Sequence, residues 1–237
     1  MKNRLLTILA AFMLIVPAVR ALGADVKSYE IKVGEFMELK VVNGIRVEYR
    51  ASEDSCGYAV FRATSDMASV IMASVEKNCL TLQLSTDGVS ARNIPTVTVY
   101  SRFLQIVENE GDSLVKVVNP NAVPVFKAKV VGNGQISVHG LTANSVDASL
   151  TTGNGTILIT GSATQAKYSL VGTGSIQCAD LKAYDVKCKL LGTGYVECWP
   201  TNKLSVIGAS SGKVYYRGKV PEIKNNSIGV KVLEIQE

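Results

Sequence analysis

The second half of the chain alternates apolar and polar residues in short runs, and a glycine motif separates these runs. The motif Gly-Asn-Gly or Gly-Thr-Gly occurs four times, at residues 132–134, 153–155, 172–174 and 192–194, and a degenerate Ser-Ser-Gly stands at 210–212. Successive copies are offset by 21, 19 and 20 residues. A fixed period near 20 residues is typical of solenoid proteins.

Each repeat contains two runs in which every second residue is apolar. After the glycines these residues are Ile136/Val138, Ile157/Ile159, Ile176/Cys178, Val196/Cys198 and Val214/Tyr216. Before the glycines the runs cover residues 128–130, 146–150, 166–170, 186–190 and 204–206. A period of two indicates strands with one buried face, and no run has the wider stripe of a helix.

Twenty residues hold two strands and two corners, which leaves no room for a crossover helix. Equivalent strands of successive repeats must therefore stack in parallel, about 4.8 Å apart. The sequence predicts an all-β protein, a single-stranded parallel β-helix with coils of about 20 residues, and right-handed coiling is the default for such connections.

The glycine motif is interpreted as a structural corner, because glycine adopts positive φ without strain and asparagine tolerates it. A phosphate-binding loop would occur once and lead into a helix, whereas this motif recurs and leads into strands. A calcium-binding repeat needs Asp after the glycines. The chain has Gln135, Thr156, Ser175 and Tyr195 there. The corner residues are Gly132, Gly134, Gly153, Gly155, Gly172, Gly174, Gly192 and Gly194.

The first half of the chain is less regular. Alternation predicts strands within residues 43–52, 58–64, 79–84 and 97–100, while residues 66–75 fit a short helix or a strand. Pro120 and Pro124 bracket a loop, which is the best internal boundary. We expect irregular coils over 27–122 and regular repeats over 123–237, in one continuous stack whose N-terminal end is covered by residues 27–48.

The first residues have the order of a secretory signal peptide. Lys2 and Arg4 precede an apolar run over 5–16, which Pro17 ends. The run is too short for a membrane span of ~20 residues, and a buried N-terminal helix is the alternative. We predict a signal peptide over 1–23, with cleavage after Ala21, Gly23 or Ala24. The first cysteine is Cys56, so a lipid-anchored N-terminus is not expected.

Removal of this segment changes the charge. The whole chain carries a formal charge of +5, and residues 1–23 contribute Lys2, Arg4 and Arg20 with no acid, which leaves +2. A nearly balanced charge does not fit a nucleic-acid-binding protein. We expect an exported protein, located in the periplasm or on the outer cell surface.

The repeated G-[NT]-G-x-[IV] motif, together with VVNGIRVEYRAS near the N-terminus and CLTLQLS further on, resembles the head-GIN-domain family of bacterial auto-transporter adhesins. The resemblance covers roughly residues 30 to 230. It implies a right-handed β-helix that is exported and has a surface or adhesion role. The family pattern often has Asp after the second glycine, which this chain lacks, and the family offers no catalytic residues to carry over.

The five cysteines are Cys56, Cys79, Cys178, Cys188 and Cys198, and an odd number leaves at least one thiol without an intramolecular partner. The last three fall on inward positions and are interpreted as core packing, with a metal or redox site as the alternative. A zinc site would lack its fourth ligand, because the single His, His139, lies two coils away and points outward. A disulfide between Cys56 and Cys79 stays open. We expect no cofactor and no metal.

Catalysis in a β-helix needs carboxylates and cations that converge in one groove. The outward acids are isolated at Asp147, Asp185 and Glu197, and one His excludes most Ser-His-Asp arrangements. We predict a protein without enzymatic activity.

Outward lysines offer a candidate ligand contact. Lys167 and Lys187 share a column, Lys189 stands beside them, and Lys127 and Lys129 extend the face. A basic strip suits an anionic glycan or lipid head group, while the alternative is that lysine keeps the sheet soluble.

Trp199 is also predicted to point outward, beside a corner at Pro200, with Tyr195, Tyr215 and Leu158 as further exposed positions. It either contacts a sugar or protein or covers the coil edge.

The C-terminal residues 229–237 read as a last strand with an exposed edge, which predicts self-association or strand addition by a partner. A cap formed by residues 221–227 is the alternative. The sequence therefore favours a non-enzymatic, exported binding or surface-scaffold module that contacts glycan or protein through its solenoid face. The alternatives are a periplasmic lipid or glycolipid binder and a carbohydrate-active enzyme.

Overall fold

The structure, a computed structural model, describes residues 26–85 and 94–236. The predicted signal peptide and its cleavage sites lie outside the described residues. The described part forms strands almost throughout, with one helix of five residues.

The N-terminal elements are short. They are β1 (Lys27–Lys32), β2 (Glu38–Val41), β3 (Arg46–Ala51), β4 (Tyr58–Ala63), α1 (Ser65–Ser69), β5 (Ile71–Glu76), β6 (Cys79–Leu84), β7 (Thr96–Ser101), β8 (Ile106–Asn109) and β9 (Leu114–Val118). Residues 66–75, which fit either a helix or a strand in the sequence, contain both, because α1 is followed at once by β5.

The C-terminal half includes four long strands that run around a bend without interruption. They are β10 (Val123–Val130), β11 (Gln135–Leu150), β12 (Thr156–Leu170), β13 (Ser175–Leu190), β14 (Tyr195–Ala209), β15 (Lys213–Tyr216), β16 (Glu222–Ile228) and β17 (Lys231–Glu234).

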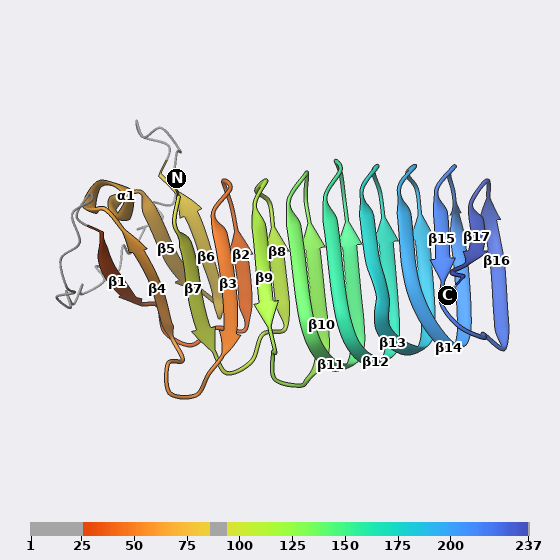
Figure 1. Ribbon diagram of the computed structural model, residues 1–237, viewed down its shortest axis with the longest axis horizontal. Helices are drawn as coiled ribbons and strands as arrows, with labels where there is room; N and C mark the ends of the chain where they lie inside the picture. Colours follow the sequence, from red (N-terminus) through yellow and green to blue (C-terminus); the bar gives the residue numbers. More distant parts are fainter. Residues whose placement is uncertain (1–25, 86–93, 237) are drawn as a thin grey trace, which may run out of the picture.

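The strands form a β-solenoid of about six turns with coils of about 20 residues, which confirms the predicted parallel β-helix (Figure 1). We call ladder 1 the parallel stack that follows the glycine corners: β3, β9, the first parts of β11 to β14, β15 and β17. Ladder 2 precedes the corners: β2, β8, β10, the last parts of β11 to β14, and β16. Inward side chains of both ladders form one continuous core.

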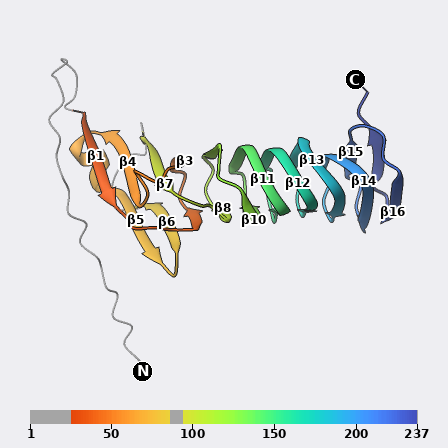
Figure 2. The same ribbon diagram turned by 90° about the horizontal axis from the view of Figure 1, so that it is seen from below.

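The order of the N-terminal coils departs from the sequence order. The β2–β3 coil lies between β6 and β7 on one side and β8 and β9 on the other. The chain therefore leaves the stack after β3, builds β4 to β7, and returns to the far side of its own first coil. Figure 2 shows these strands gathered at one end of the stack.

The two ends of the stack differ from what the sequence led us to expect. Of residues 27–48, only β1 lies at the N-terminal end, because β2 and part of β3 lie inside the stack. The antiparallel pairs β1–β4, β4–β7 and β5–β6 form that end. At the other end residues 221–227 are not a cap over the edge, because β16 continues ladder 2 by pairing in parallel with β14.

The tight corners depend on glycine for two different reasons. Gly132 and Gly153 have φ of +101° and +76°, as expected for residues that turn the chain. The second glycine of each motif does not have positive φ. At Gly194 an added Cβ would lie 2.0 Å from the carbonyl oxygen of Gly174 in the preceding coil. Close stacking of backbone on backbone, rather than φ, excludes a side chain there.

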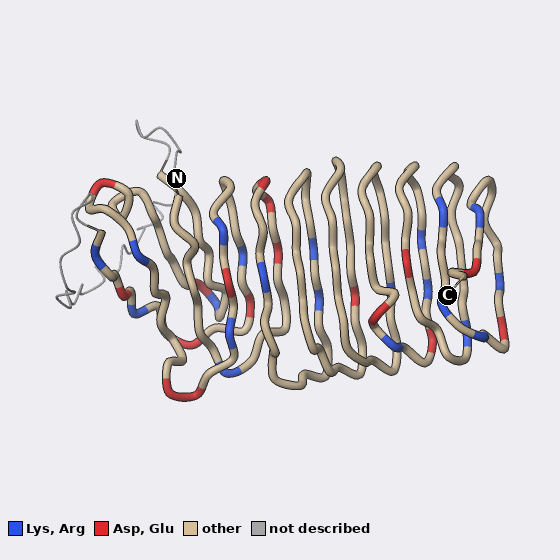
Figure 3. The backbone as a smooth tube through the Cα atoms, in the orientation of Figure 1, with Lys and Arg blue, Asp and Glu red and all other residues tan. Residues whose placement is uncertain are grey.

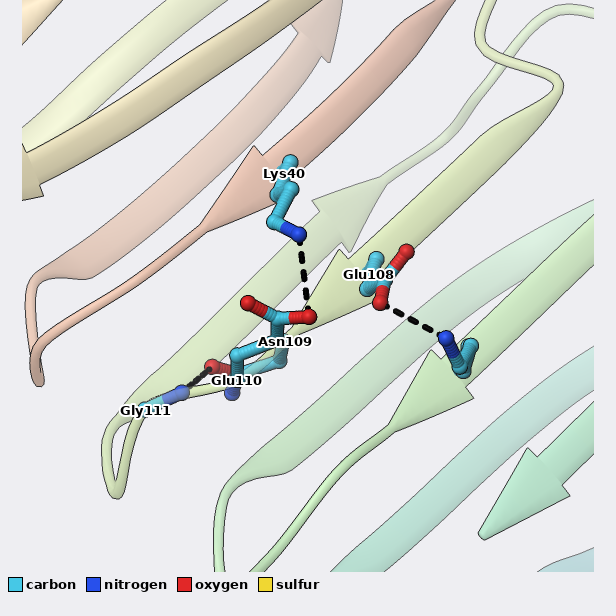
Figure 4. Close-up of polar contacts among 6 residues, drawn as sticks. Lys40, Glu108, Asn109, Glu110 and Gly111 are labelled. Atoms are coloured by element: carbon cyan, nitrogen blue, oxygen red, sulfur yellow. Dashed lines mark hydrogen bonds and ion pairs between the residues drawn. The ribbon is translucent and has the colours of Figure 1, made fainter. Parts of the chain in front are cut away.

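One polar residue is built into the core. Asn109 is fully buried at the ladder 2 position where later coils have Val130 and Leu150. Its amide donates to the carbonyl oxygens of Ser113 (2.8 Å) and Gln135 (3.0 Å). It also accepts a hydrogen bond from the Gly111 N–H, which Figure 4 shows. All hydrogen bonds of the amide oxygen and nitrogen thus go to the backbone of two corners, which offsets the cost of burial.

Parallel pairing continues across Pro120 and Pro124, since β10 pairs with β8 before the loop and with β11 after it. The division at residues 122 and 123 stays a prediction.

Candidate functional site

A shallow groove crosses the outer face of ladder 2. It has a volume of about 350 Å³ and is lined by Ser145, Gln165, Ala166, Lys167, Asp185, Val186, Lys187, Lys203 and Ser205. These residues come from the last parts of β11 to β14. The outward ones alternate with core residues, of which Ala166 and Val186 form the floor of the groove, because side chains along a strand point to opposite faces.

The register places the candidate lysines around this groove. Lys167 pairs with Lys187 across β12 and β13, and Lys189 stands two residues further along β13 beside Ser169. All three side chains are exposed. Within the described residues none of the three has a hydrogen bond or an ion pair. Figure 3 shows charged positions along the whole stack. The register places the like charges of Lys167 and Lys187 on adjacent coils.

Two other lysines of this face have ion pairs, because Lys129 binds Glu108 at 2.8 Å and Lys203 binds Glu222 at 3.2 Å. Asp147 stands between Lys127 and Lys167 in the register. Within the described residues, three lysines without an ion pair therefore lie close together on ladder 2: Lys167, Lys187 and Lys189.

Exposed apolar side chains adjoin the lysines. Val171 and Leu191 follow the last buried leucine of β12 and β13, and they are 37% and 49% exposed. The sequence analysis did not single out these two residues, nor Gln165 and Lys203 in the groove. The signal for the apolar pair was present, because the residue before each first glycine should face outward when the preceding leucine faces inward.

Trp199 lies at the bend of β14, and its ring is flanked by cations. Lys182 of the preceding coil lies 5.7 Å from the ring centroid, and Arg217 of the following coil lies 5.0 Å from it. Arg217 also binds Asp180 at 2.9 Å. Because Lys182 and Arg217 approach the Trp199 ring from the coils on both sides, this geometry favours a Trp199 side chain that packs over the edge of its own coil.

The inner cysteines surround a buried tyrosine. Cys178, Cys188, Cys198 and Tyr168 are all inaccessible to solvent, and Cys178 stacks on Cys198 in the register. Burial raises the pKa of the Cys178 thiol to about 12. The Tyr168 hydroxyl and Cys198 have smaller effects on this pKa. A thiol held in its protonated form is a poor metal ligand and nucleophile.

All five cysteines are free thiols, so Cys56 and Cys79 do not form a disulfide in this structure. Burial raises the pKa of the Cys79 thiol. His139 lies on ladder 1, where its Nε2 and the Ser137 hydroxyl are 2.8 Å apart. Within residues 26–85 and 94–236 no group of three or more potential ligands is arranged to hold a metal ion.

The outward carboxylates named in the sequence do not meet in the groove. Asp147 stands between Lys127 and Lys167 in the register, and Asp185 accepts a hydrogen bond of 2.8 Å from the Asn202 amide. Glu197 lies on the opposite ladder, where its nearest acidic neighbour, Asp180, is bound to Arg217.

In the part of the chain that the structure describes, α1 is the one helix, and it is far too short to cross a membrane.

These features define a β-solenoid whose outer face carries charged and apolar side chains over a closed core. The chain belongs to the family described as "Putative auto-transporter adhesin, head GIN domain", which matches residues 35–219. This confirms the family that the glycine motif indicated. No curated protein matches the chain.

Solved structures share the fold at low identity. A putative adhesin from Bacteroides fragilis NCTC 9343 has a TM-score of 0.79 and 20% identity, over 90% of this chain and 97% of that one. A putative adhesin from Parabacteroides distasonis ATCC 8503 has a TM-score of 0.69 and 21% identity, over 90% and 98%. A protein from the same organism described as a putative lipid binding protein has a TM-score of 0.69 and 17% identity, over 89% and 97%.

Proposed function

We propose that the protein is a non-enzymatic, exported binding module of the cell envelope that holds an acidic glycan on ladder 2. The observation that carries this proposal is the cluster of Lys167, Lys187 and Lys189 beside the groove, three lysines without an ion pair in the part of the chain that the structure describes. Adjacent like charges destabilise a sheet slightly. An extended polyanion removes this repulsion and follows a rigid face without a change in the protein.

The family supports an adhesin-like role and export, and neither the family nor the similar structures are described as enzymes. The location in the periplasm or at the outer surface is part of the proposal.

The test measures binding of polygalacturonate, a soluble acidic polysaccharide, to the purified chain at low and high salt. We expect binding that weakens steeply with salt, and at least a tenfold loss in the triple variant Lys167→Ser, Lys187→Ser, Lys189→Ser. The matched control, Arg62→Ser, Lys219→Ser, Lys231→Ser, removes the same number of exposed charges elsewhere and should bind within twofold of the parent. Equal losses in both triple variants would reduce the effect to net charge and contradict the proposal.

A second candidate function is binding of an anionic lipid head group. Val171 and Leu191 favour it, because exposed apolar side chains beside lysines suit an amphiphile. One similar structure is described as a putative lipid binding protein. Sedimentation with phosphatidylglycerol vesicles, but not with phosphatidylcholine vesicles, and a loss in Val171→Ser, Leu191→Ser would favour this function over the glycan.

A further inference from the structure

Ladder 1 carries a group of part-exposed polar and aromatic side chains at its C-terminal coils. The group consists of Gln177, Tyr195, Glu197 and Tyr215, which we call the tyrosine patch. Glu197 stands between Gln177 and Tyr215 in one outward row, and Tyr195 belongs to the next row, between Ser175 and Lys213. At equivalent positions the two preceding coils have Gln135, Ser137, Thr156 and Leu158, so the patch is specific to β13, β14 and β15.

The patch is held in place by its own contacts. The Gln177 amide donates to the Tyr195 hydroxyl at 2.9 Å and to the Ser175 hydroxyl at 3.2 Å. Ser175 is 6% exposed although it points outward. The rings of Tyr195 and Tyr215 meet edge to face, with centroids 6.1 Å apart. Because Tyr195 accepts the bond from Gln177, its own hydroxyl proton is available to a ligand.

Glu197 is the least satisfied group of the patch. Its side chain is half-buried, and within the described residues it has no hydrogen bond and no ion pair. Burial is the main cause that raises the pKa of the Glu197 carboxyl, and the charge of Asp180 raises it further. A carboxylate in such surroundings lacks donors, and ligand hydroxyls are able to supply them.

The charges around the patch restrict the ligand. Glu197 repels an anion. Lys213 beside Tyr195, and Lys182 beside Trp199, repel a cationic partner. A neutral molecule with apolar faces and many hydroxyls fits both constraints, since tyrosine rings pack against C–H faces and the carboxylate accepts from hydroxyls.

We infer that the tyrosine patch is a binding site for a neutral saccharide, separate from the basic groove on ladder 2. Tyr195 and Tyr215 provide ring contacts, Glu197 accepts hydrogen bonds from sugar hydroxyls, and Gln177 positions Tyr195.

Affinity gel electrophoresis tests the site with three neutral polysaccharides: dextran, galactomannan and a soluble mixed-linkage β-glucan. We expect at least one to retard the parent. Tyr195→Ala and Tyr215→Ala should each lower its affinity at least tenfold, and Glu197→Gln three- to tenfold. The control Tyr184→Ala removes an exposed tyrosine at the bend of β13, outside the patch, and should bind within twofold of the parent.

If Tyr195→Ala does not fold, Tyr195→Phe replaces it as the test, because it keeps the ring and removes only the hydroxyl. Its affinity for the polysaccharide should fall two- to fivefold. The triple lysine variant of the groove should bind the neutral polysaccharide like the parent, so this site and the proposed function are tested independently. Absence of retardation by all three polysaccharides, or retardation that persists in both Tyr195→Ala and Glu197→Gln, would overturn the inference. Tighter binding of oligolysine than of any polysaccharide would overturn it as well.

Discussion

The Lys40 ammonium lies 2.9 Å from the Glu110 carboxylate, and this contact joins the first coil of the stack to a coil formed much later in the sequence. Lys40 belongs to β2, and Glu110 follows β8, with which β2 pairs in parallel. Next to it, Glu108 binds Lys129 of β10. The two ion pairs thus connect three successive coils of ladder 2 at the point where the chain returns to the stack.

The Lys40–Glu110 pair predicts a pH dependence. The hydrogen bond to Lys40 is the main cause that lowers the pKa of the Glu110 carboxyl below its ordinary value of 4.5, and the same bond raises the pKa of Lys40 above 10.5. The carboxylate's contribution is therefore present above pH 4.5 and lost as the pH falls through the lowered pKa. The ammonium's contribution is present below pH 10.5 and lost as the pH rises through the raised pKa.

We expect Glu110→Gln to lower the free energy of unfolding at pH 7 by about 1 kcal/mol or less, because the pair is partly exposed. At pH 3 the cost of the substitution should be smaller than at pH 7. Urea unfolding at both pH values measures this, with Glu76→Gln as a control that is exposed and whose effect should be near zero. A larger cost at pH 3 than at pH 7 would contradict the assignment.

The two reasons for glycine at the corners predict different costs. Gly132→Ala meets open space and has only the strain of positive φ, which should cost about 1–2 kcal/mol. Gly194→Ala places a methyl group against the backbone of the preceding coil and should cost about 3 kcal/mol. Gly153→Val combines both and should cost at least as much. Thermal and urea unfolding rank the three variants, and equal melting temperatures for the parent and Gly194→Ala would refute the stacking argument.

Tyr168 predicts a substitution that does not harm the fold. Its hydroxyl is fully buried beside the Cys178 thiol, and within the described residues it makes no hydrogen bond of normal geometry. Burial is the main cause that raises the pKa of the phenol well above its ordinary value. The neighbouring thiols of Cys178, Cys198 and Cys188 raise it further. Tyr168→Phe should leave the free energy of unfolding unchanged or raise it by about 1 kcal/mol. A loss of more than 1 kcal/mol would show that the hydroxyl has a partner in solution.

The C-terminal coil predicts self-association. Within the described residues β16 pairs only with β14 and β17 only with β15, and Ile228 is 79% exposed. The outer edge of β17 is thus unpaired in that part of the chain, and an unpaired strand edge accepts a strand from a second copy. Light scattering should show a dimer or larger species that becomes monomeric after removal of residues 231–237. A monomer at high micromolar concentration, unaffected by the truncation, would contradict this prediction.

The sequence by itself determined the repeating part of the fold. The glycine period and the alternation from Ala128 onward predict strands, coil length and inward cysteines. They do so because each coil of a solenoid packs against its neighbours in the same way. The same alternation placed Lys167 and Lys187 in one column, since a fixed period converts sequence offset directly into register.

Tertiary structure decided what the period does not encode. Nothing in the alternation of β2 and β3 shows that β4 to β7 will pack on one side of them and β8 and β9 on the other, because strand pairing between distant segments depends on their combined burial. The tyrosine patch arises the same way. Gln177, Tyr195, Glu197 and Tyr215 are ordinary outward residues of three separate coils, and only stacking at the spacing of a parallel sheet brings their side chains into contact.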